Sequence, residues 1–231
     1  MNDFVYICKS GENHELKYSI RSVIKCFPNA NIWVVGGKPN WYIGNYLELK
    51  QSGAKYKNAY ENLKLICKSD EISDNFYLMN DDFYIIKNIK SIEMFHGGLL
   101  KRKVNLYETL NPNSTYTAKL KFTLNKLIDL GIENPYDYEL HIPMLMNKNN
   151  LKESLSHGDK LLWRSMYGNI FNVGGIEIED VKVYMSGKLS VKSYDIKKDK
   201  YPFISSSDSS FDYLHNKILK VNFPIKTLFE K

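Results

Sequence analysis

The beginning of the chain alternates short apolar runs with a segment of helical periodicity. Residues 4–8 and 31–35 are apolar runs of strand length, and apolar side chains recur at helical spacing over residues 12–26. Pro28 ends that helix. A strand, a helix and a strand within about 30 residues form a βαβ unit, which implies a right-handed crossover and a parallel sheet.

Similar patterns continue along the rest of the chain. Helices are expected over residues 56–68, 117–130, 161–171 and 211–220. Strands are expected over residues 76–79, 83–86, 181–185 and 189–194. This order predicts an α/β fold in which helices flank a mainly parallel, Rossmann-related sheet, with a small C-terminal α+β appendage. We expect a single domain over residues 1–231.

Composition and cysteine usage narrow the class of protein. The 231 residues are 43% hydrophobic and 25% charged, which is enough for one substantial core. Cys8, Cys26 and Cys67 are odd in number and widely spaced, which favours free thiols in a reducing cytoplasm over a disulfide framework or a zinc site. The N-terminus lacks the features of a signal peptide, and no apolar run approaches the ~20 residues of a membrane span. We therefore expect a cytoplasmic protein with no transmembrane segment.

The most informative segment places two carboxylates between apolar runs. Asn80, Asp81 and Asp82 separate the expected strand at residues 76–79 from the run at 83–86. Adjacent carboxylates in such a place are costly unless a cation pairs with them or water reaches them. Mg²⁺ or Mn²⁺ bound to a phosphorylated ligand would supply that cation. The alternative is a strand end with two solvated acids.

Other polar residues also follow expected strands. Lys9 follows the first strand, and Gly36 and Gly37 follow the second. Ligands of open parallel sheets bind at the carboxyl ends of the strands, so these residues and Asn80–Asp82 are expected to converge on one crevice. The glycine pair does not form a GxGxxG fingerprint, which argues against a dinucleotide-dependent dehydrogenase. The net charge of +6 favours an anionic partner.

Two further features allow a structural explanation as well as a functional one. The basic triplet at residues 101–103 is expected to be a solvated loop. His141 lies two residues before a proline that holds the chain extended, and a lone histidine is more often a structural hydrogen-bonding group than a ligand.

Several segments resemble those of the stealth proteins, bacterial transferases of capsule and exopolysaccharide synthesis. Residues 14–22, His-Glu-Leu-Lys-Tyr-Ser-Ile-Arg-Ser, resemble the family's N-E-L-R-Y-S-L-R-S segment. Residues 80–83 resemble its N-D-D-x-F block, and residues 141–143 its H-x-P element. The stretch from residue 203 to residue 230 resembles the terminal block, I-x-D followed by a helix and F-P-x-x-S-x-F-E. The matches keep the family's order and span most of the chain.

The resemblance overlaps that of small GT-A-type glycosyltransferases, which bind a metal through a D-x-D. It implies a GT-A-like domain with a nucleotide-binding half at residues 1–100 and an acceptor-side half at residues 101–231. Stealth proteins transfer sugar 1-phosphates, whereas GT-A enzymes transfer the sugar alone. The family's D-x-V-Y-T-W-V-x-G block and its following aspartates are reduced here to Asp-Phe-Val-Tyr-Ile-Cys-Lys-Ser-Gly at residues 3–11, and Lys17 replaces the usual arginine. These departures favour a metal-dependent glycosyltransferase, with sugar-1-phosphate transfer as the alternative.

The resemblance and the expected chemistry assign roles to particular residues. Asp82 would hold Mn²⁺ or Mg²⁺, with Asp81 as a second ligand or, like Asn80, in contact with a ribose or phosphate oxygen. His141 would be a further ligand or a catalytic base. Arg21 would bind phosphate through its fork, or else form a structural ion pair with Glu15 or Glu12. Asp208 would bind the acceptor or cap a helix. The remaining substrate-binding candidates are Lys9, Glu15, Gly36, Gly37, Lys55, Lys57 and Asn80.

The expected donor is a nucleotide sugar such as a UDP-sugar, and the acceptor is a saccharide. A second acceptor class is modified DNA, because bacteriophages glycosylate modified bases and a positive net charge suits a nucleic acid. A carbohydrate-binding protein without enzymatic activity is the third possibility, and it would need neither the metal nor the paired acids.

Overall fold

The computed structural model describes residues 2–185 and 189–231, and within them the chain packs as two compact units. The first contains the residues up to Ile92, His141–Met146 and Val181–Lys231. The second contains Glu93–Leu140 and Asn147–Asp180. The expected division at residue 100 does not follow this packing, because the C-terminal residues return to the first unit.

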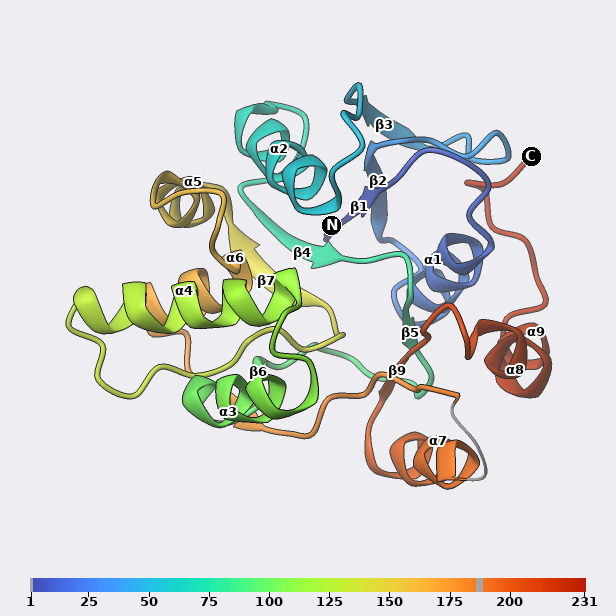
Figure 1. Ribbon diagram of the computed structural model, residues 1–231. Coiled ribbons are helices and arrows are strands. Elements are labelled where there is room, and N and C mark those ends of the chain that lie inside the picture. The colour runs from blue at the N-terminus through green and yellow to red at the C-terminus, as the bar shows by residue number, and fades with distance from the viewer. Residues whose placement is uncertain (1, 186–188) are drawn as a thin grey trace. The chain divides into compact units, whose positions relative to one another are not determined.

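The first unit is built on a five-stranded sheet in the order β3-β2-β1-β4-β7 (Figure 1). Its strands are β1 (Asp3–Cys8), β2 (Asn31–Gly36), β3 (Asn45–Glu48), β4 (Asn75–Met79) and β7 (Met144–Asn147). β1 runs parallel to β2 and β4, and β2 runs parallel to β3. The prediction of an α/β fold with a mainly parallel sheet is therefore confirmed.

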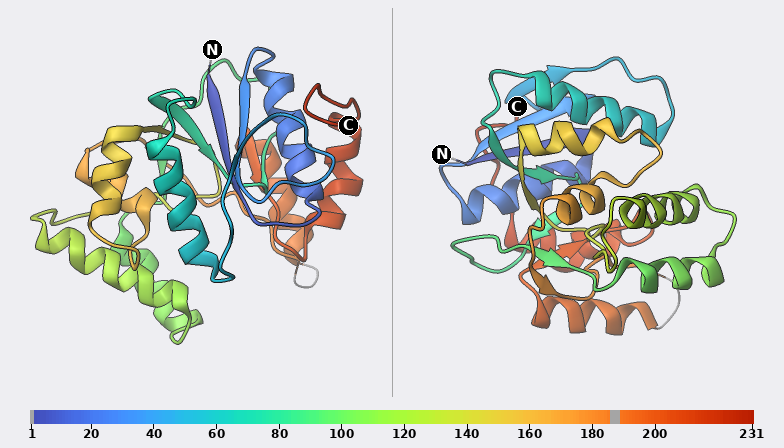
Figure 2. Two further views of the ribbon diagram at one scale, coloured as in Figure 1. Left: turned by 90° about the horizontal axis from the view of Figure 1, so that it is seen from above. Right: turned by 90° about the vertical axis from the view of Figure 1, so that its left-hand side faces the viewer.

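Helices cover the sheet of the first unit. The helices α1 (His14–Cys26) and α2 (Lys55–Lys68) lie on opposite sides of β1 and β2 (Figures 1 and 2). α1 begins where the side chain of Asn13 accepts a hydrogen bond from the amide of Leu16. Its apolar face, which includes Leu16, Ile20 and Val23, is fully buried and completes the βαβ unit expected from the sequence.

The C-terminal part of the chain is integrated into the first unit and is not an appendage. β5 (Phe83–Ile85) pairs antiparallel with β9 (Phe203–Ser205). After β9 comes one continuous helical stretch, which consists of α8 (Phe211–Leu214), a π-helical turn (His215–Leu219) and α9 (Lys220–Asn222). A buried apolar cluster that includes Tyr84, Ile204, Leu214, Leu219 and Phe223 packs this stretch against the strand pair.

Two expected strands are absent from the described part of the chain. Residues 181–185 form only an isolated bridge, between Lys182 and Ser205, and residues 189–194 belong to the helix α7 (Leu189–Lys200). The alternating pattern at 189–194 is short and is followed by charged residues that leave no apolar strand face. Asp195 and Lys198 instead form an ion pair of 3.0 Å at a spacing that a helix permits.

The second unit is mainly helical. Its elements are β6 (Phe95–His96), α3 (Leu100–Leu110), α4 (Thr115–Asp129), α5 (Lys148–Ser156), α6 (Trp163–Ile170) and β8 (Ile176–Glu177). The basic triplet lies on α3, so the prediction of a loop is wrong. Helical geometry turns Lys103 inward, where its Nζ lies 2.7 Å from Asp137 Oδ2, while Lys101 and Arg102 remain exposed.

Two expectations about the whole chain can be compared with the described residues. Cys8, Cys26 and Cys67 form no disulfide. None of the helices in residues 2–185 and 189–231 combines the length and the apolar character needed to cross a membrane.

Candidate active site

The polar strand ends meet at one edge of the sheet. In the parallel register Cys8 lies beside Gly36, and Tyr6 lies beside Met79. The loops that begin at Lys9, Gly37 and Asn80 therefore leave the sheet side by side, because parallel strands end at a common edge. The common edge agrees with the expectation from the sequence, and the ligand crevice at this edge stays a prediction.

The first two of these loops approach each other through their backbones. A Cβ atom on Gly37 would lie 2.3 Å from the amide nitrogen of Ser10, and Gly36 has a φ of +106°, so neither position accommodates a side chain without displacement or strain. The loop between β3 and α2 also contacts this edge, since Gln51 Nε2 donates to the carbonyl of Cys8 at 2.6 Å. Lys55 and Lys57 follow that loop at the start of α2, and both are exposed.

Asp81 is tied to the N-terminus of α1. Asn13 Nδ2 donates to Asp81 Oδ2 at 2.6 Å, while Asn13 Oδ1 caps the helix. Burial and then the charge of Asp82 raise the pKa of Asp81, against the lowering effects of Asn13 and Lys9. The half-buried Asp81 is therefore a carboxylate that a nearby cation would stabilise.

Asp82 is buried and already paired. Lys182 Nζ and Ser205 Oγ each lie 3.0 Å from Asp82 Oδ2. Within the described residues, no hydrogen bond reaches the other carboxylate oxygen, Oδ1. Asp82 thus keeps one oxygen available for a ligand.

Glu15 joins α1 to the serine-rich loop after β9. Ser206 Oγ donates to Glu15 Oε1 at 2.5 Å and lies 2.9 Å from the hydroxyl of the buried Tyr84. Burial raises the pKa of Glu15 to about 7, and the charges of Asp81, Asp82 and Asp208 add to this, while the hydrogen bond from Ser206 opposes it. Glu15 therefore faces the same cluster of acids as the strand-end loops.

Arg21 is engaged by the C-terminal segment. Its Nε and Nη2 donate to the two carboxylate oxygens of Glu230 at 2.8 and 2.6 Å, and Nη1 donates to the carbonyl of Phe223 at 3.0 Å. The guanidinium is buried. This arrangement matches the structural alternative, although the partner is Glu230 and not Glu15 or Glu12.

The other candidates occupy different surroundings. His141 packs edge-on against Phe83, with ring centroids 6.1 Å apart. Asp208 is exposed in the serine-rich loop, and Ser210 is the N-cap residue of α8, so the capping alternative for Asp208 is wrong. Asn80 is half-buried, and its carbonyl accepts a hydrogen bond from the amide of Phe83 at 3.4 Å.

The acid pair suits a metal that arrives with its ligand. Across residues 2–185 and 189–231, no three His, Cys, Asp or Glu side chains are grouped as a metal site, so the expected trio of Asp81, Asp82 and His141 is not assembled. Mg²⁺ in phosphate-binding sites commonly uses one or two carboxylates and completes its shell with phosphate oxygens and water. Asp81 and the available oxygen of Asp82 fit that requirement.

Several residues of this site were not expected from the sequence. Asn13 had a local signal, since an asparagine that directly precedes a helix is a typical N-cap. Ser205 and Ser206 lie in the stealth-like stretch 203–230, although no role was expected for them. Lys182 and Tyr84 had no signal, because Lys182 meets Asp82, and Tyr84 meets Ser206, only through the packing of distant segments.

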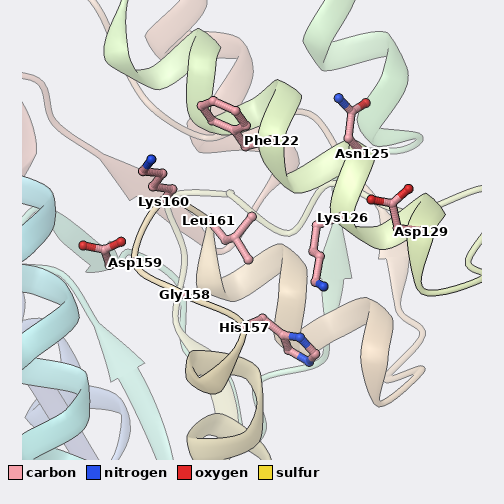
Figure 3. Close-up of a pocket in the computed structure, with 9 residues that line it drawn as sticks. All are labelled: Phe122, Asn125, Lys126, Asp129, His157, Gly158, Asp159, Lys160 and Leu161. Atoms are coloured by element: carbon pink, nitrogen blue, oxygen red, sulfur yellow. The ribbon is translucent and has the colours of Figure 1, made fainter.

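A separate pocket of about 360 Å³ lies in the second unit. Figure 3 shows Phe122, Lys126 and Asp129 on α4 along one side, with His157 and Leu161 from the segment between α5 and α6 along the other. Its lining contains none of the residues that the sequence predicts as functional.

No protein-family model and no curated protein matches this chain. Among solved structures, the chain is similar to the galactosyltransferase LgtC in complex with donor and acceptor sugar analogs. The TM-score is 0.47 and the identity 10%, over 90% of this chain and 88% of that chain. It is also similar to an active-site mutant of LgtC, with a TM-score of 0.45 and 10% identity over 88% and 86% of the two chains. Likeness at this level carries no conclusion about activity, which has to be argued from the site itself.

Proposed function

We propose that this protein is a metal-dependent glycosyltransferase that moves a sugar from a nucleotide-sugar donor to a saccharide acceptor. The observation that carries the proposal is the convergence of acids from distant segments of the chain at the carboxyl ends of the parallel strands. Residues from segments far apart in the chain make direct polar contacts there. These contacts are Asn13–Asp81, Glu15–Ser206 and Ser205–Asp82.

Such a cluster is costly for the fold alone. Burial and the charges of Asp81 and Asp82 raise the pKa of the half-buried Glu15 to about 7, and burial and the charge of Asp82 raise the pKa of Asp81. Clusters of perturbed acids at the carboxyl ends of parallel strands are typical of ligand sites. The available oxygen of Asp82 and the backbone approach at Gly36 and Gly37 fit a ligand with phosphate groups.

Each part of the site has a proposed role. Asp82 and Asp81 would hold Mn²⁺ or Mg²⁺, which would supply Lewis-acid stabilisation of the departing diphosphate. Lys9, Lys55 and Lys57 attract the phosphates, and Asn80 and Glu15 contact the rest of the donor. The bond from the sugar to the diphosphate breaks as the bond to the acceptor oxygen forms. Asp208 or His141 accepts the proton of the acceptor hydroxyl.

The second candidate function is sugar-1-phosphate transfer. The order and convergence of the stealth-like segments favour it, whereas the altered block at residues 3–11 favours transfer of the sugar alone. The two reactions differ in the nucleotide that they release. Sugar transfer from a UDP-sugar releases UDP, and sugar-phosphate transfer releases UMP.

Product analysis tests the proposal. The protein is incubated with UDP-, GDP- and CDP-sugars, Mn²⁺ and a panel of saccharides, and the products are identified by mass spectrometry. We expect a nucleoside diphosphate and a glycosylated saccharide from the wild type, and neither from Asp82→Asn. Asp195→Asn, which removes an exposed acid from α7, is the matched control and should retain turnover. Release of a nucleoside monophosphate would establish the second candidate.

The acceptor and the cellular location are part of the proposal. A cytoplasmic enzyme would have direct access to nucleotide sugars. The charge of +6 keeps modified DNA as a possible acceptor class. DNA binding that weakens steeply with salt would favour DNA as the acceptor, whereas tight saccharide binding that needs no metal and leads to no product would indicate a carbohydrate-binding protein.

A further inference from the structure

Lys182 places a positive charge against the acid that is proposed to bind the metal. Its Nζ lies 3.0 Å from Asp82 Oδ2, and the two side chains are only 18% and 11% exposed. Ser205 donates to the same oxygen. The carboxylate is therefore paired and hydrogen-bonded before any ligand arrives.

The backbone fixes the position of Lys182. Lys182 and Ser205 form a β-bridge, in which the amide of Val183 donates to the carbonyl of Ser205 at 2.8 Å. The amide of Ser205 donates in turn to the carbonyl of Val181 at 3.3 Å, and Lys197 Nζ donates to the carbonyl of Lys182 at 2.5 Å. The backbone of Lys182 is thus held on both sides of the residue, and its side chain is mostly buried.

We propose that Lys182 is the resident counter-cation of Asp82. A divalent metal that binds Asp82 has either to displace the Lys182 ammonium group or to bind close to it in spite of the repulsion between the two positive charges. This inference rests on the proposed metal role of Asp82. An ammonium group and a divalent ion compete for the same carboxylate, because each of them neutralises the negative charge of the carboxylate and the two cations repel each other. The free metal therefore binds weakly, whereas a metal that arrives with nucleotide phosphates also brings anionic oxygens with which Lys182 can pair.

Direct metal binding tests this inference without any turnover. Mn²⁺ alone is titrated into the wild type, Lys182→Gln and Lys182→Met, and the free ion is followed by electron paramagnetic resonance. Both substitutions should tighten Mn²⁺ binding by on the order of tenfold, because they remove the competing charge. Lys198→Gln removes the same charge from the partly exposed lysine that pairs with Asp195, and it should leave the affinity unchanged.

The possible outcomes separate the inference from the proposed function. Unchanged or weaker Mn²⁺ binding in both folded Lys182 variants would overturn the inference, as would an equal gain in Lys198→Gln. Thermal unfolding of each variant identifies any that fail to fold, and the methionine variant keeps the length of the side chain without its charge. If no sugar donor is found, a tenfold gain in Mn²⁺ affinity in the Lys182 variants would still support the inference about Lys182. Turnover that proceeds fully in excess chelator would remove the metal role itself.

Discussion

At the scale of single residues, the site combines acids with partners of different kinds. Asp81 has a neutral amide partner in Asn13, whereas Asp82 has a cationic partner in Lys182. Within the described residues, the hydroxyl of Ser206 is the only hydrogen-bond partner of the Glu15 carboxylate. These differences decide how each acid responds to substitution and to pH.

Asp82→Asn should affect both activity and stability. It removes a proposed metal ligand, so we expect turnover to fall at least about 100-fold. It also removes the carboxylate charge that pairs with the mostly buried Lys182, which should lower the free energy of unfolding by about 3 kcal/mol. Initial rates and urea unfolding measure the two effects. Asp195→Asn should stay within about 0.5 kcal/mol of the wild type. Full turnover in a folded Asp82→Asn variant would remove Asp82 from the site.

Glu15 should make stability depend on pH in an unusual direction. Its pKa in the folded protein is raised to about 7, above that of the unfolded chain. Both states hold the proton at low pH, but the unfolded state loses it first as the pH rises. The contribution of Glu15 to stability is therefore complete below pH ~4.3 and is lost as the pH rises through about 7.

Glu15→Gln should remove this component. The wild type should lose stability relative to the glutamine variant between these two pH values, as measured by urea unfolding at a series of pH values. Glu12→Gln changes an exposed acid just before the same helix and should leave the profile unchanged. A constant difference between wild type and Glu15→Gln across this range would contradict the expectation.

At the scale of elements, α1 connects the sheet to the C-terminal part of the first unit. Ser19 donates to the carbonyl of Phe83, and Ser22 Oγ accepts the amide of Ile85 at 3.0 Å, so the helix binds the backbone of β5. Tyr18 contacts His215 through its hydroxyl at 2.9 Å. The stealth-like segment at residues 14–22 is thus in large part a connector between elements.

Ser22→Ala tests this connection. The substitution leaves the buried amide of Ile85 without its partner, which should lower the free energy of unfolding by about 2 kcal/mol. Hydrogen exchange at that amide should accelerate more than in the centre of β1. Ser156→Ala, which changes an exposed serine of α5, is the control and should leave both quantities near those of the wild type. An unchanged exchange rate at Ile85 would show that the serine does not hold β5.

At the scale of the whole chain, one ion pair joins positions 209 residues apart. Arg21 and Glu230 are both buried and meet through two hydrogen bonds, at 2.8 and 2.6 Å. Burial alone would raise the pKa of Glu230, but hydrogen bonds from Arg21 and Thr227 and the charge of Arg21 lower it. The stability that Glu230 contributes is present above its unfolded pKa and is lost as the pH falls through the lowered value.

Arg21→Lys should therefore be a stability variant. Lysine cannot reproduce the two parallel hydrogen bonds, so we expect a loss of about 2 kcal/mol, with turnover of the folded protein retained. Glu230→Gln should cost a similar amount, and in a double-mutant cycle the two effects should be clearly less than additive. Arg102→Lys alters an exposed pair of 3.7 Å and should change stability little. A stable but inactive Arg21→Lys would return Arg21 to the substrate site.

The sequence by itself determined the α/β class, the βαβ unit and the edge at which the polar strand ends meet. These follow from local periodicity and from the common edge of parallel strands. Only the tertiary structure decided which charges pair. Arg21 finds Glu230 and Lys182 finds Asp82 across separations of 209 and 100 residues, and the strand expected at 189–194 is a helix. Ion-pair partners are chosen by the packing of distant elements, and no local pattern records that packing.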